Sequence, residues 1–126
     1  MIPIVLGGPD PVFRRALASV VRRVDGIELR GEAGTPLSLR MLVASQRPTV
    51  LVLDACWVQA GSNLLGDMLA CPASPRVLVH APSLDRPEIL ATVMQGVHGC
   101  LPSDAHPTTW CRAIQAVHGG EPSISN

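Results

Sequence analysis

The chain has 126 residues, 47% of them hydrophobic and 16% charged, so it can bury the core of one domain and is too apolar for wholesale disorder. Ten arginines balance ten acidic residues, and this zero net charge argues against a general nucleic-acid or membrane-surface binder. The sequence contains no lysine, which excludes Walker-type phosphate loops, Schiff-base chemistry and Ser–Lys dyads.

Neither a membrane span nor a secretory signal is visible in the sequence. No apolar run approaches about 18 residues, and no basic region followed by an apolar stretch stands at the start. We therefore expect a soluble cytoplasmic protein. Its cysteines are irregularly spaced, without a CxxC pair, which is typical of reduced, buried thiols rather than of a disulfide framework or a zinc site. They are Cys56, Cys71, Cys100 and Cys111.

The N-terminal segment predicts a strand followed by an amphipathic helix. Ile2–Leu6 is a compact apolar run, ended by the Gly-Gly-Pro that follows it. Asp10 is a good N-cap, with a proline in the first helical position. Apolar residues then recur at helical spacing as far as Val24. Four arginines are expected on the opposite, polar face: Arg14, Arg15, Arg22 and Arg23.

Strand-like and helix-like segments continue to alternate in the middle of the chain. Ile27–Glu32 predicts a weaker strand, and Pro36–Gln46 a helix that must end before the next proline. Thr49–Asp54 carries the strongest strand signal, because its continuous aliphatic run is typical of a central parallel strand covered on both faces.

The second half of the chain repeats this rhythm. Ser62–Leu69, Pro87–Gly96 and Pro107–His118 predict helices, and Arg76–His80 and Gly99–Leu101 predict strands. Alternating strands and helices of this kind indicate a parallel sheet with helices on both faces. Sites in such sheets lie beyond the carboxyl ends of the strands. Here those ends are Gly7–Pro9, Asp54, His80–Ala81 and Pro102–Ser103.

Several segments, in order, carry a family resemblance that covers essentially the whole chain. They are IPIVLGGPDPVFRRAL, GIELRGEAGTPLSL, RPTVLVLDACW, SPRVLVHA and VMQGVHGCLPSDAHPTTWCRAIQAVHGGEPSIS. With these segments the chain resembles the CheY-like receiver domain of bacterial response regulators, of the type that precedes a LuxR/NarL-like helix-turn-helix. The resemblance implies a flavodoxin-like α/β fold with a five-stranded parallel sheet in the order 2-1-3-4-5.

In a working receiver, several groups surround one phospho-acceptor aspartate. An acidic pair after the first strand holds Mg²⁺, a Ser or Thr ends the fourth strand, and a Lys follows the fifth. The resemblance assigns the phospho-acceptor position to Asp54 and the acidic pair to Gly8 and Pro9, whose side chains offer no metal ligand. Asp10 stands one residue from the lost pair, where the N-cap role explains it more simply.

The remaining pocket positions also depart from the family pattern. The Ser/Thr position falls on Ala81, the Lys position on Ser103 and the aromatic switch position on Cys100. Trp57 lies on the loop that covers the pocket in this family, where it either closes the pocket, meets a ligand or partner, or packs on the next helix. We therefore interpret the chain as a degenerate receiver, a regulatory domain rather than an enzyme, with no cofactor and doubtful Mg²⁺ binding.

The resemblance also implies partners. Residues 1–120 are expected to form the receiver domain, and residues 121–126 to begin a linker to a DNA-binding domain outside this chain. The receiver would form a homodimer through its first and fifth helices, or respond to a small ligand or partner protein, without touching nucleic acid itself. Two alternatives stay open. Asp54 could still be phosphorylated, or the chain could be a flavodoxin-like ligand-binding domain or enzyme that uses His80 with Cys56 and Cys100.

Overall fold

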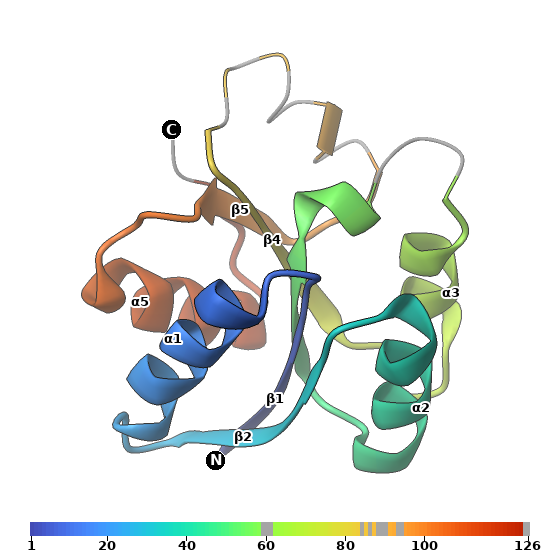
Figure 1. The fold of residues 1–126 in the computed structure, drawn as a ribbon, viewed down its shortest axis with the longest axis horizontal. Helices are drawn as coiled ribbons and strands as arrows, with labels where there is room; N and C mark the ends of the chain where they lie inside the picture. The colour runs from blue at the N-terminus through green and yellow to red at the C-terminus, as the bar shows by residue number, and fades with distance from the viewer. Residues whose placement is uncertain (59–61, 84, 86, 88–90, 93–94, 125–126) are drawn as a thin grey trace.

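A single parallel sheet organises the molecule (Figure 1). The computed structural model describes residues 1–58, 62–83, 85, 87, 91–92 and 95–124. In this part of the chain the strand order is β2-β1-β3-β4-β5-β6. The strands are β1 (Ile2–Gly7), β2 (Ile27–Ala33), β3 (Val50–Asp54), β4 (Arg76–Ala81), β5 (Gly99–Pro102) and β6 (Ser123–Ile124).

Helices cover both faces of this sheet. Helices α1 and α5 lie on one face, and α2 and α3 lie on the other (Figure 1). Their bounds are α1 (Pro11–Arg22), α2 (Pro36–Gln46), α3 (Leu64–Ala70) and α5 (Pro107–His118), and a short 3₁₀ helix, η1 (Ala55–Trp57), follows β3. Half of the predicted helix over Pro87–Gly96 falls on residues outside those that the structure describes.

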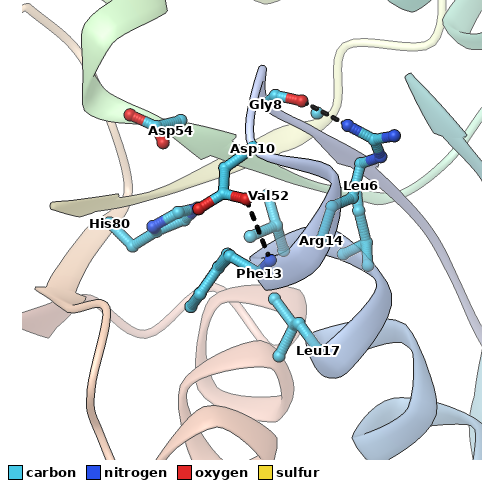
Figure 2. Close-up of a pocket in the computed structure, with 10 residues that line it drawn as sticks. Leu6, Gly8, Asp10, Phe13, Arg14, Leu17, Val52, Asp54 and His80 are labelled. Carbon is cyan, nitrogen blue, oxygen red and sulfur yellow. Dashed lines mark hydrogen bonds between the residues drawn. The ribbon is translucent and has the colours of Figure 1, made fainter. Parts of the chain in front are cut away.

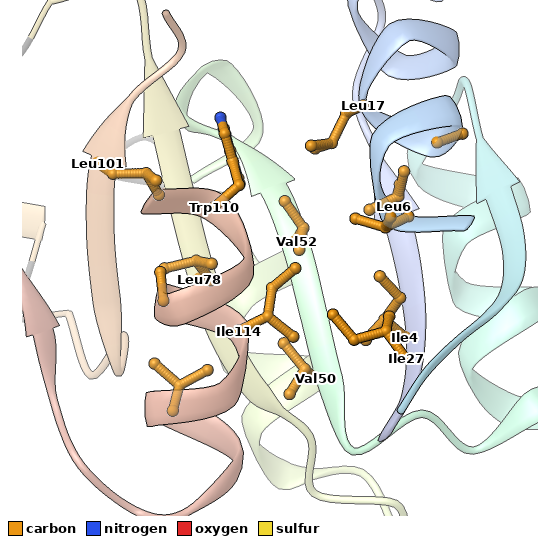
Figure 3. Packing of buried hydrophobic residues seen from close by; sticks show 14 residues of the cluster. Ile4, Leu6, Leu17, Ile27, Val50, Val52, Leu78, Leu101, Trp110 and Ile114 are labelled. Atoms are coloured by element: carbon orange, nitrogen blue, oxygen red, sulfur yellow. The ribbon is translucent and has the colours of Figure 1, made fainter. Parts of the chain in front are cut away.

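The central strand β3 separates two hydrophobic cores. Val50 and Val52 face α1 and α5, where Ile114 and Trp110 pack against them (Figure 3). The alternate β3 residues face α2 and α3, because successive side chains of a strand point to opposite faces. All four apolar residues of β3 are at most 1% exposed, which confirms the predicted central strand.

The first helix begins where the sequence predicts. The Oδ1 atom of Asp10 accepts hydrogen bonds from the backbone N–H groups of Val12 and Phe13, at 3.0 and 3.3 Å. These bonds satisfy two of the amides that a helix leaves without an intrahelical partner. The predicted N-cap is therefore confirmed, and it fixes the direction in which the chain leaves β1.

Two features of the fold differ from the expectations or add to them. The third helix begins at Leu64, two residues later than predicted. The tail adds an edge strand, β6, which pairs with β5 and extends the sheet past residue 120. An ideal Cβ on Gly99 would lie 2.5 Å from the carbonyl oxygen of Ser123, so only a glycine lets the tail approach this closely.

No helix within the described part of the chain has the length and apolar character needed to cross a lipid bilayer.

Candidate functional site

The carboxyl ends of β1, β3 and β4 surround a small cavity of about 10 Å³ (Figure 2). This volume corresponds to roughly one water molecule. Four of the lining residues carry titratable or charged groups, and the rest are apolar or glycine. The four are Asp10, Arg14, Asp54 and His80.

Asp54 ends β3 and is only partly buried. Its Oδ1 atom accepts a hydrogen bond of 3.0 Å from the backbone N–H of Cys56, so the carboxylate caps η1. Gly8 packs directly against it, because an ideal Cβ on Gly8 would lie 3.2 Å from the Cβ of Asp54. The backbone of Gly8 thus occupies the place next to Asp54, and Pro9, the other position assigned to the acidic pair, is exposed.

Arg14 stabilises the turn between β1 and α1. Its Nη1 donates a hydrogen bond of 2.6 Å to the carbonyl oxygen of Gly8, and its Nε lies 3.4 Å from Oε1 of Glu32 on β2. The side chain is 16% exposed, so the expectation that Arg14 lies on the polar face of the helix is wrong. Arg14 stands three and four residues before the buried Leu17 and Ala18, and this spacing places it at the border of the buried face.

His80 lies beside Asp54 in the sheet, since the register of β3 and β4 pairs these two residues. Its side chain points toward α1 and α5, and the residue is 4% exposed. The imidazole packs against two aromatic rings, with centroids 4.5 Å from Phe13 and 5.4 Å from Trp110. Its Nδ1 atom lies 2.8 Å from Oγ of Ser103, within hydrogen-bonding distance.

The protonation state of His80 reflects two opposing effects. Burial disfavours the charged imidazolium, whereas the carboxylate of Asp54 favours it. Burial is the larger effect, and it lowers the pKa of His80 to about 4. The side chain facing the Asp54 pocket from β4 is therefore neutral at pH 7.

The other predicted pocket residues lie near this cluster. Ala81 ends β4 and pairs with Pro102, and its carbonyl oxygen accepts a hydrogen bond of 2.7 Å from the backbone N–H of Ser103. The assignment of the Ser/Thr position to Ala81 stays a prediction. The β4 residue paired with Asp54, however, is His80.

Trp57 and Cys100 lie on the α2–α3 side of the sheet. The Trp57 ring packs over Gly7, where an ideal Cβ would lie 3.1 Å from it, and joins the hydrophobic cluster of that side. Cys100 is fully buried and pairs with Val79 on β4, and burial raises the pKa of its thiol. Trp57 thus packs inside the fold, in line with the third of its predicted roles, and its role as a pocket cover stays a prediction.

The hypothesis of a Cys–His pair finds no support in this geometry. His80 pairs with Leu101, so Cys100 points to the opposite face of the sheet. Cys56 is exposed. Partial desolvation, and to a lesser extent the nearby Asp54, raises the pKa of its thiol to about 11. A thiol with such a pKa stays protonated at neutral pH and is a poor nucleophile or metal ligand.

The residues around Asp54 do not fit a Mg²⁺ ion. This cation requires oxygen ligands in near-octahedral geometry. Gly8 and Pro9 supply no side-chain oxygen, Oδ1 of Asp10 caps α1, and the carbonyl of Gly8 accepts a hydrogen bond from Arg14. Among the described residues, no three His, Cys, Asp or Glu side chains gather into a group that could hold a metal ion.

Comparison with known proteins places this architecture. No family model matches the chain. The chain is 25% identical over 123 residues to a Ycf55-like protein of Synechocystis. This match covers 95% of the chain but only 22% of that relative. The signal receiver domain of the response regulator NarL from Mycobacterium tuberculosis superimposes with a TM-score of 0.83 at 20% identity, covering 95% of this chain and 98% of the other.

A LuxR-family two-component response regulator from Aurantimonas superimposes with a TM-score of 0.86 at 19% identity, covering 99% of this chain and 90% of the other. The chain has the fold of a response-regulator receiver domain. Within this receiver fold, the predicted strand order 2-1-3-4-5 is confirmed, and β6 adds an edge strand to it.

The inward position of Arg14 and the hydrogen-bond partner of His80 in this pocket were not predicted from the sequence. Arg14 was expected in solvent, and the hydrogen bond between His80 and Ser103 joins residues 23 positions apart. A signal for His80 did exist, because it follows Leu78 at the strand period of two and therefore shares its core-facing side. Nothing local in the sequence pointed to Ser103 as its partner.

Proposed function

We propose that the chain is a regulatory receiver domain whose output does not depend on conventional Mg²⁺-dependent phosphorylation of Asp54. The observation that carries this proposal is the composition of the pocket. Asp54 is retained, but its neighbours are the backbone of Gly8 and the neutral imidazole of His80. The chain holds no lysine that could pair with a phosphoryl group.

The energetic consequence follows from the nature of phosphoryl transfer. The reaction depends almost entirely on positioning and electrostatic stabilisation of a highly charged transition state. Removing one preorganised electrostatic group commonly costs roughly 3 kcal/mol, or about a hundredfold in rate. A pocket that lacks both the acidic pair and the lysine would therefore leave Asp54 a very poor phosphoryl acceptor.

The proposed output surface is the face formed by α1 and α5. An open groove of about 400 Å³ runs between these helices. Its lining is partly apolar and includes one exposed cation, Arg23. The lining residues are Val20, Arg23, Val24, Pro107, Thr108 and Cys111. This lining supports a homodimer through α1 and α5, which would control a DNA-binding domain in the full-length protein. A small ligand or a partner protein would then take the place of phosphorylation as the input.

Intact mass spectrometry tests the proposal. The 126-residue chain is incubated with a small-molecule phosphodonor and Mg²⁺, beside an Asp54→Asn variant and a functional receiver as positive control. We expect no adduct on either form of this chain while the positive control is phosphorylated. A phosphoryl adduct on the wild type alone would overturn the proposal and establish the alternative, a receiver that is still phosphorylated on Asp54.

A further inference from the structure

His80 connects the Asp54 pocket with the two helices of the proposed output face. On one side it pairs with Asp54 in the sheet and lines the same cavity. On the other side its ring contacts Phe13, in the first turn of α1, and Trp110, in the first turn of α5. Phe13 and Trp110 also contact each other, with centroids 6.1 Å apart. A change in the His80 ring therefore reaches both helices directly.

The charged groups facing His80 come from three elements. Asp54 belongs to β3, Asp10 to the turn before α1, and Arg14 to α1 itself, and all three line the cavity that His80 lines. The charge of Arg14 is already balanced, because its guanidinium lies 3.4 Å from Glu32. On the side of β5 and α5, His80 contacts the neutral side chains of Ser103 and Trp110.

In this arrangement His80 is the group whose protonation can respond to a change of charge in the pocket. Burial keeps its ring neutral, and the carboxylate of Asp54 already favours the charged form without prevailing. A further anionic group beside Asp54 would add to the same attraction. The surroundings also suit an imidazolium once it forms, since aromatic faces attract cations. Ser103 Oγ can accept a hydrogen bond from a protonated Nδ1.

We propose that His80 is a conditional cation: a second negative charge placed beside Asp54 lets its ring take up one proton from solvent at a higher pH, and the imidazolium changes the packing of Phe13 and Trp110. The proton adds to the ring nitrogen that lacks one, so both nitrogens then donate. The inference deepens the proposed function, because it names the route by which an anionic ligand or modification at the pocket would reach the α1–α5 face.

The test adds the charge by mutation, so that it needs neither a kinase nor a ligand. Gly8→Asp places a carboxylate beside Asp54, and Gly8→Asn is a matched control with nearly the same shape but no charge. Both variants suffer the same 3.2 Å approach to Asp54, so the steric effect cancels in the comparison. A Trp57→Phe background leaves Trp110 as the sole tryptophan. His80 is titrated by NMR of its imidazole, and Trp110 by its fluorescence.

We expect the His80 midpoint in Gly8→Asp to lie above that in Gly8→Asn by about one pH unit. Trp110 emission should change with the same midpoint. Equal midpoints in the two variants would overturn the proposal, and so would Trp110 emission that stays flat while His80 titrates.

If both Gly8 variants unfold, Asp54→Asn replaces them, and its His80 midpoint is expected below that of the wild type. An unchanged midpoint would contradict the coupling. The phosphodonor experiment stays independent of this result, because it measures an adduct on Asp54 and not the charge of His80. Failure of the proposed function and failure of the conditional cation are therefore distinguishable.

Discussion

The guanidinium of Arg14 donates a hydrogen bond of 2.6 Å to the carbonyl oxygen of Gly8, which ties the first turn of α1 to the end of β1. The same side chain pairs with Glu32 on β2. One residue thus holds together two strand ends and a helix beneath the Asp54 pocket. The family resemblance places the acidic pair at the turn after β1. In this chain the turn carries Gly8 and Pro9 instead, and the guanidinium of Arg14 stabilises it.

Removing Arg14 should therefore destabilise the domain. Arg14→Ala leaves the carbonyl of Gly8 without its charge-assisted partner, and among the described residues Glu32 is left with the ion pair to Arg22, at 3.9 Å. We expect a loss of about 1–3 kcal/mol in the free energy of unfolding. Arg15→Ala is the matched control, because Arg15 is exposed on the same helix, and it should change stability by less than about 0.5 kcal/mol. Urea unfolding measures both, and equal effects would contradict this role of Arg14.

The buried His80 makes stability depend on pH. The pKa of its folded form, about 4, lies below the ordinary value of 6.5. As the pH falls from 6.5 toward 4, the unfolded chain takes up a proton that the folded chain refuses, so stability present above pH 6.5 is lost across this window. The loss amounts to at most about 3 kcal/mol. Below the window the contribution of His80 stays constant.

His80→Gln isolates this contribution, because glutamine is neutral at every pH. Urea unfolding at pH 7 and pH 4.5 should show a smaller drop for the variant than for the wild type. His98, whose pKa is also lowered by burial and by Arg76, is present in both proteins and cancels. Parallel losses in the two proteins would show that His80 does not cause the pH dependence.

Magnesium should leave the thermal stability unchanged. A ligand that binds the folded state alone raises the melting temperature by mass action. Because the acidic pair is replaced by Gly8 and Pro9, whose side chains offer no metal ligand, we expect no shift with millimolar Mg²⁺ in a thermal-shift assay. A functional receiver serves as positive control. A rise of several degrees in this chain would show that the pocket binds the ion.

The edge strand β6 depends on a single glycine. In Gly99→Ala the new methyl group would meet the carbonyl oxygen of Ser123 at 2.5 Å and Cδ1 of Leu78 at 2.9 Å. We expect destabilisation of about 1–3 kcal/mol from this overpacking. Gly66→Ala, in α3, has no heavy atom within 4 Å of the new methyl group and should instead stabilise the helix by up to about 1 kcal/mol. Thermal or urea unfolding of both variants decides whether the tail packs as described.

Many of the strands and helices could be predicted from local sequence patterns. The aliphatic run of β3, the N-cap at Asp10 and the bounds of α2 and α5 each depend on neighbours within a few residues. Periodicity and capping act over that distance, and so the sequence alone predicted them. The absence of lysine is likewise a property of composition, and it excludes a lysine at the pocket whatever the register.

The tertiary structure decided the contacts that give this pocket its character. Arg14 turns inward only because Glu32 and the carbonyl of Gly8 converge on it from two strands. His80 meets Ser103, Phe13 and Trp110 across separations of up to 67 positions. Such contacts depend on strand order and register, which bring distant residues together without leaving a local trace in the sequence. The residue types at the pocket were thus readable beforehand, whereas their partners emerged only from the packed sheet.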